Sequence, residues 1–124
     1  MSDLDTLDLR PFVPALDFAR SVRFYLDLGF TRRGSNDTLA EFHRGHAAFV
    51  LHADYMAVVA ENTVLQLEVA DVDAWWRHVH EARLVDIYSV RQTPVERQTG
   101  GRRGFSLTDP SGVRWRIVGP PPSR

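Results

Sequence analysis

The feature of this sequence that most constrains its fold is a faint internal repeat. When the chain is shifted so that Asp17 falls on Asp71, Phe30 falls on Leu84. In both copies an apolar stretch precedes the aspartate, and a segment with apolar residues at helical spacing follows it. Aspartate is a preferred helix N-cap residue, so each copy predicts a strand followed by a helix. The repeat therefore favours two similar modules within the chain.

Apolar periodicity supplies the expected boundaries of the elements. The first copy predicts a strand over 7–15, a helix over 18–28 that ends at Gly29, and hairpin strands over 39–44 and 47–53. The second copy predicts a strand over 64–70, a helix over 72–84, and strands over 86–90, 104–108 and 113–118. Asp109-Pro110-Ser111-Gly112 has the residue types of a tight turn between the last two strands.

This order of elements predicts an α+β fold of two βαβββ modules that form a cupped mixed sheet. We expect module one over about 7–55 and module two over about 62–118, within a single domain over 1–124. With 44% apolar and 25% charged residues, the composition is typical of a soluble globular protein. No apolar run reaches the roughly 18 residues of a membrane span, so we expect no membrane partner.

Charge and cysteine content narrow the functional classes further. All 15 basic residues are arginine, but the formal net charge is only -1, so we do not expect nucleic-acid binding. The N-terminus is acidic where a signal peptide is basic, and the chain has no cysteine. These two features favour the cytoplasm as its location.

Four short motifs place the chain near a known superfamily. They are Val13-Pro-Ala-Leu-Asp17, Ser21-Val-Arg-Phe-Tyr25, Leu28-Gly-Phe30 and Phe105-Ser-Leu-Thr-Asp-Pro-Ser-Gly112. Together they resemble the vicinal oxygen chelate superfamily of glyoxalases, extradiol dioxygenases, fosfomycin-modifying enzymes and bleomycin resistance proteins. Within it the chain is most similar to bleomycin resistance proteins, through Pro11, Asn62-Thr63 and Arg103-x-Phe105. The resemblance implies a homodimer whose subunit interface forms the pocket, and it allows exchange of the first strand at Pro11.

The resemblance also locates the positions that hold a divalent metal in enzymes of the superfamily. In this sequence they fall on Arg10, Val50, Val64 and Arg116. Valine has no donor atom, and arginine is a cation without a usable lone pair. We therefore expect no metal and no other cofactor. The predicted function is binding of a small molecule or antibiotic for sequestration, without turnover.

Strand alternation separates a core face from a polar face that would line the pocket. The candidate ligand-binding residues are Arg10, Phe12, Leu39, Glu41, His52, Glu61, Gln66, Glu68, Arg103, Ser106 and Arg116. Bleomycin resistance proteins are implied to grip their ligand with aromatic planes and acidic groups, and here Leu39, Gln66 and Gly101 stand at the aromatic places. The arginines at 10, 103 and 116 would suit a ligand with a carboxylate, phosphate or phenolate.

Two other functions stay open at this point. The chain could be a glyoxalase-like enzyme, a lyase, isomerase or dioxygenase, with its metal site shifted to His52 and Glu68. It could also be an interaction dimer without a ligand, in which Arg116 pairs with Glu68 and the polar face satisfies itself.

Overall fold

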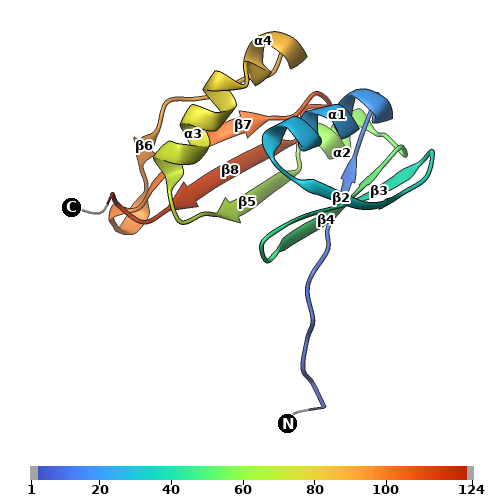
Figure 1. Cartoon of the computed structure of the whole chain (residues 1–124), viewed down its shortest axis with the longest axis horizontal. Helices are drawn as coiled ribbons and strands as arrows, with labels where there is room; N and C mark the ends of the chain where they lie inside the picture. Colours follow the sequence, from blue (N-terminus) through green and yellow to red (C-terminus); the bar gives the residue numbers. More distant parts are fainter. Residues whose placement is uncertain (1–2, 123–124) are drawn as a thin grey trace.

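The computed structural model describes residues 3–122, in which the elements follow the expected module order (Figure 1). The first module contains β1 (Phe12–Pro14), α1 (Phe18–Leu28), β2 (Thr31–Ser35), β3 (Leu39–Arg44) and β4 (Ala47–His52). After the short helix α2 (Ala57–Glu61), the second contains β5 (Val64–Glu68), α3 (Val72–Glu81), α4 (Leu84–Tyr88), β6 (Glu96–Arg97), the 3-10 helix η1 (Thr99–Gly101), β7 (Arg103–Thr108) and β8 (Arg114–Gly119). None of the helices within 3–122 has the length and apolar character needed to cross a bilayer.

Each module forms its own four-stranded mixed sheet with the same strand order. Sheet one runs β1-β4-β3-β2 and sheet two runs β5-β8-β7-β6. In both sheets the first strand of the module pairs in parallel with its last strand, with Phe12 opposite Val50 and Gln66 opposite Arg116. The α+β fold of two βαβββ modules is thus confirmed. The mixed sheet consists of two separately hydrogen-bonded halves.

The two capping aspartates act as the repeat predicts. The Asp17 carboxylate accepts a hydrogen bond from the backbone N–H of Arg20 at 3.1 Å, and Asp71 accepts one from Ala74 at 3.0 Å. Helix α1 has the predicted bounds and ends at Gly29, whose φ of 119° suits glycine. In Figure 1, α1 and α3 lie above the strands, and the opposite faces of the two sheets are left uncovered by these helices.

Several predicted boundaries differ from the structure. The strand over 86–90 is wrong, because Leu84–Tyr88 form α4 and bury Leu84 and Tyr88, which lie four residues apart. A short apolar segment does not by itself distinguish a strand from a helix. The strand over 7–15 is wrong for 7–11, since only Phe12–Pro14 pair with β4, and the helix over 72–84 already ends at Glu81. The sequence Thr-Arg-Arg-Gly-Ser of β2 lacks apolar alternation, which explains why this strand was not predicted.

The side chain of Tyr25 on α1 joins the two modules. Its hydroxyl donates to Oδ2 of Asp109 at 2.6 Å and accepts from Nε1 of Trp115 at 2.9 Å. Its ring packs edge-on against Phe49 of sheet one, with the ring centroids 4.7 Å apart. Burial raises the pKa of Tyr25 well above its usual value, so the hydroxyl stays a donor.

The β7–β8 turn is held against the first module by the same cluster. Oδ1 of Asp109 accepts from the backbone N–H groups of Ser111 and Val113, at 2.8 and 2.9 Å. Oγ of Ser111 accepts from the backbone N–H of Leu16 at 2.9 Å. Burial raises the pKa of Asp109, although its hydrogen bonds act in the opposite direction. The predicted turn at Asp109–Gly112 is therefore confirmed, and it also serves as an inter-module contact.

We expect Tyr25→Phe to lower the free energy of unfolding by about 2 to 4 kcal/mol. The change removes the hydrogen-bond partner of Oδ2 of Asp109 and of Nε1 of Trp115, both in the core. Urea denaturation measures the loss. Tyr88→Phe is the matched control: its hydroxyl donates to the exposed Asp27, which water can solvate, so the loss is about 1 kcal/mol or less. Equal losses in the two variants would contradict the role given to Tyr25.

Candidate functional site

The first cleft lies on the face of sheet one that points away from α1. Ala40 and Phe42 are buried on the helix side, as the alternation predicts, whereas Leu39 and Phe12 are 38% and 59% exposed on the other face. The cleft has a volume of about 370 Å³ and is lined by Phe12, Gly34, Ser35, Asn36, Leu39, Glu41 and Val50. Its surface is therefore apolar at the floor and flanked by a few polar groups.

Ion pairs neutralise the charges around this first cleft. Arg10 donates to Glu41 and also pairs with Asp8. The hydrogen bond with Asp8, aided by the negative charge of Glu41, raises the pKa of Arg10. His52 packs edge-on against Phe12, with the ring centroids 5.6 Å apart. A ligand in this cleft would meet an aromatic and aliphatic surface whose nearby charges already have partners.

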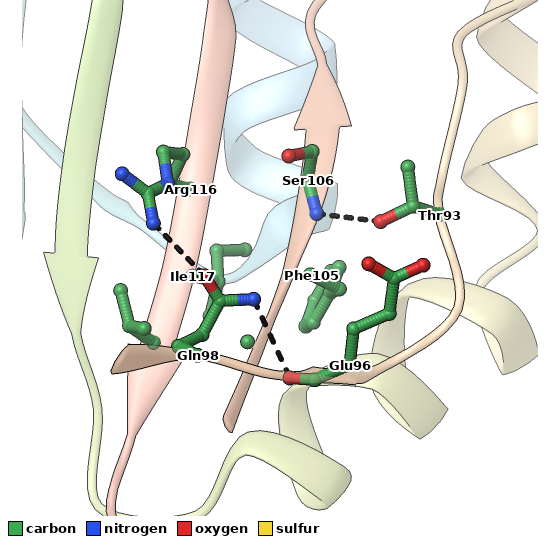
Figure 2. Close-up of a pocket in the computed structure, with 9 residues that line it drawn as sticks. Thr93, Glu96, Gln98, Phe105, Ser106, Arg116 and Ile117 are labelled. Atoms are coloured by element: carbon green, nitrogen blue, oxygen red, sulfur yellow. Dashed lines mark hydrogen bonds between the residues drawn. The ribbon is translucent and has the colours of Figure 1, made fainter. Parts of the chain in front are cut away.

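The second cleft lies on sheet two, between β7, β8 and the segment 93–98 (Figure 2). It has a volume of about 230 Å³ and is lined by Thr93, Glu96, Gln98, Gly104, Phe105, Ser106, Arg116, Ile117 and Val118. Ser106 and Arg116 are cross-strand partners, so they present their side chains on the same face. The backbone N–H of Ser106 donates to Oγ1 of Thr93 at 2.8 Å, which closes one wall.

On sheet two, Glu68 and Arg116 have separate partners. Glu68 accepts from Arg102 and from Nε2 of Gln66, and the hydrogen bond from Arg102 lowers the pKa of Glu68. Arg116 instead donates to Oε1 of Gln98 at 3.0 Å. The Arg116–Glu68 pair of the interaction-dimer alternative is thus not formed, because Glu68 pairs with Arg102 instead. Arg116 keeps a neutral partner only.

Six of the eleven predicted site residues line neither cleft: Arg10, His52, Glu61, Gln66, Glu68 and Arg103. Arg103 points to the helix side of sheet two and pairs with Asp73 of α3, since its position alternates with the cleft-facing Ser106 and Gly104. Glu61 ends α2 and lies beside Gly112 of the β7–β8 turn. Apart from Arg103 and Glu61, the candidates fall into two groups, one on or beside each sheet. Among the residues described, no hydrogen bond or ring contact joins these two groups.

The four positions at which the resemblance places metal ligands do not fit a divalent ion. The strand registers make Val50 and Arg116 equivalent in the two modules, as the repeat makes Arg10 and Val64. Two of the four side chains have no donor atom, and the other two are permanent cations. No metal-dependent step can therefore be derived from these positions.

The shifted metal site of the alternative interpretation is not formed in this subunit. His52 is on β4 of sheet one and Glu68 on β5 of sheet two, where Glu68 is engaged by Arg102. Over residues 3–122, no group of three or more His, Asp or Glu side chains is placed to hold a metal ion.

Of the nine residues that line the second cleft, only Ser106 and Arg116 were predicted from the sequence, and three of the missed ones lie outside β7 and β8. Thr93, Glu96 and Gln98 come from a segment with no apolar period, and they reach the cleft only because the segment folds back along β7. The backbone N–H of Thr93 donates to the carbonyl of Ser106 at 3.0 Å, which fixes that path. No local sequence signal distinguishes this segment from an ordinary loop.

Comparison with known proteins agrees with this architecture. The family model of the "Glyoxalase/Bleomycin resistance protein/Dioxygenase superfamily" matches residues 10–117. No protein with a curated description matches the sequence.

Among solved structures, the bleomycin-binding protein of Streptomyces verticillus in complex with copper(II)-bleomycin is 27% identical, with a TM-score of 0.76 over 97% of this chain and 99% of that one. A bleomycin resistance determinant encoded on the transposon Tn5 is 24% identical, with a TM-score of 0.78 over 93% and 98% of the two chains. A lactoylglutathione lyase from Agrobacterium tumefaciens is 14% identical, with a TM-score of 0.68 over 90% and 92%.

The family match covers most of the chain and coincides with both βαβββ modules. This chain belongs to the glyoxalase/bleomycin resistance protein/dioxygenase superfamily.

Proposed function

We propose that the protein binds and sequesters a small molecule or antibiotic, without a metal, in a cavity between the two subunits of a homodimer. The observation that carries this proposal is the side-chain chemistry of Arg10, Val50, Val64 and Arg116, which cannot ligate the metal on which enzymes of this fold depend. Proteins that share a fold and its cleft can have different functions, because the function depends on the side chains of the site.

Comparison with related structures supports the binding of a small molecule. One of the solved structures with this fold is a bleomycin-binding protein in complex with copper(II)-bleomycin. The present chain has Leu39, Gln66 and Gly101 where the resemblance implies aromatic planes. Phe12 and Leu39 still offer exposed apolar surface in the first cleft. We therefore propose a ligand with an apolar part, for which bleomycin is one candidate to be tested.

The N-terminal segment supports the proposed dimer. Residues 5–9 run away from the body of the subunit and belong to neither sheet (Figure 1). Leu7 and Leu9 are 100% and 87% exposed, while Asp8 and Arg10, which alternate with them, pair with each other. Two leucines on one side of an extended chain are unfavourable in water, and their burial against an apolar surface lowers the free energy. A second copy of the chain is the proposed partner surface for this segment.

The dimer is tested by sedimentation equilibrium at micromolar concentration, where we expect the mass of two chains. The double variant Leu7→Asp/Leu9→Asp should shift the equilibrium towards the monomer, because charged residues would then face the partner. Ile87→Asp is the matched control: Ile87 is 54% exposed on α4, away from the segment, and its replacement should leave the mass unchanged. A wild-type monomer would refute the interface cavity.

The absence of a metal requirement is tested by thermal melts of chelator-treated protein. Added zinc, nickel, manganese or iron(II) should change the melting temperature by no more than about 1 °C, since a bound ion would stabilise the folded state by mass action. Metal analysis of the untreated protein should find far less than one ion per subunit. A stoichiometric ion, or a rise of several degrees, would favour the metal-dependent enzyme over the binding protein.

Ligand binding is tested by thermal shift against a panel of small carboxylates and antibiotics that includes bleomycin. We expect at least one compound to raise the melting temperature, and Arg116→Ala to reduce that rise by roughly half or more, because charge-assisted hydrogen bonds are the stronger ones. Arg114→Ala, on the same face of β8 but outside the cleft lining, should leave the rise intact. A panel that stabilises nothing would count against the proposed function itself.

A further inference from the structure

We infer that the cleft on sheet two binds the headgroup of a zwitterionic ligand, with an ammonium group at Glu96 and a carboxylate at Arg116. The inference rests on the proposed function and names the chemical class of ligand for one part of the site. The observation behind it is that some charged groups of sheet two have an ion-pair partner and others have none.

Most charged groups near the cleft are already engaged. Glu68 pairs with Arg102, and Arg103 pairs with Asp73 on the helix side. Among the residues that line the cleft, two charged groups of opposite sign have no ion pair. Among the residues described, the Glu96 carboxylate has no hydrogen bond or ion pair, and Arg116 has only the neutral amide of Gln98. These two leftover groups belong to opposite walls of the same cleft (Figure 2).

The leftover charges do not neutralise each other, because Gln98 lies between them. Its Oε1 accepts from Nη2 of Arg116 at 3.0 Å, and its Nε2 donates to the backbone carbonyl of Glu96 at 3.4 Å. In Figure 2 the Glu96 carboxylate turns away from Gln98 towards Ser106 and Thr93. The hydroxyl of Ser106 has no hydrogen-bond partner within the described chain, so it is a third free polar group in the cleft.

The wall that carries Glu96 is held rigidly against the sheet. Nε1 of Trp76 donates to the carbonyl of Thr93 at 2.9 Å, and Thr93 exchanges two hydrogen bonds with the backbone of Ser106. The backbone N–H of Gln98 donates to the carbonyl of Arg102 at 2.6 Å. A wall fixed at both ends places its carboxylate before the ligand arrives, which lowers the entropic cost of binding.

A zwitterion is the ligand class that meets all three free groups. A simple carboxylate would pair with Arg116 but would be repelled by Glu96. A simple amine would pair with Glu96 but would be repelled by Arg116. A headgroup with both charges pairs each one, and its remaining oxygen or nitrogen can bond to the Ser106 hydroxyl. The volume of about 230 Å³ is below the range of pockets for drug-sized ligands, so the cleft suits a headgroup and not a whole large ligand.

Three probes of one scaffold separate the two charges: L-phenylalanine, phenylalaninamide and 3-phenylpropanoate. They are titrated into isotopically labelled full-length protein, and the amide resonances of Thr93 and Ser106 are followed by NMR. We expect phenylalanine to shift these resonances and to bind about 5- to 10-fold more tightly than either singly charged probe, as is reasonable for two partly exposed charge pairs.

Two variants test which residue binds the ammonium group and which binds the carboxylate. Glu96→Gln should remove the preference for phenylalanine over 3-phenylpropanoate, and Arg116→Gln should remove the preference over phenylalaninamide. Arg114→Gln, two residues along β8 on the same face, should change neither ratio. Equal binding of the three probes, no binding of phenylalanine, or ratios unaffected by both variants would overturn the inference. If an antibiotic or carboxylate of the wider panel still stabilised the protein, only the inference about the zwitterionic headgroup would fail. A panel without any stabilising compound would refute the proposed function as well.

Discussion

The buried hydroxyl of Tyr25 is the constraint on which the arrangement of the two modules depends. It belongs to α1 of module one, yet both of its hydrogen-bond partners, Asp109 and Trp115, belong to module two. A polar group without a partner in the core costs free energy, so the three side chains favour one docking geometry over others that bury equal apolar area. The relative positions of the two clefts follow from that geometry, because the hydrogen bonds of Tyr25 fix α1 of module one against the β7–β8 turn and β8 of module two.

The two sheets share a topology but present different surfaces. Sheet one offers Phe12 and Leu39, and the ion pair of Arg10 with Glu41 neutralises the charge beside them. Sheet two offers the polar groups of Ser106 and Arg116. A cavity formed from sheet one of one subunit and sheet two of its partner would combine an apolar half with a dipolar half. Such a cavity would suit an amphipathic ligand better than either cleft alone.

One position bears both on metal binding and on the polar cleft. Arg116 stands where the resemblance implies a metal ligand, which a guanidinium cannot be, and it also lines the second cleft. Its strand register with Gln66 and Ser106 corresponds to that of Val50 in the first module. The pairing of these strands rests on backbone hydrogen bonds, so it is compatible with different side chains at this position.

The sequence by itself determined the features that depend on neighbouring residues. Asp17 and Asp71 cap helices because the cap is a local hydrogen bond, and the alternation of Ala40 and Phe42 with Leu39 assigns faces because a strand has a period of two. Only the tertiary structure decided which charged groups meet. Glu68 pairs with Arg102 and not with Arg116, and Glu96 lines the cleft because the aperiodic segment 93–98 lies beside β7. These contacts join residues far apart along the chain, so their partners depend on the packing of whole elements and not on any local pattern.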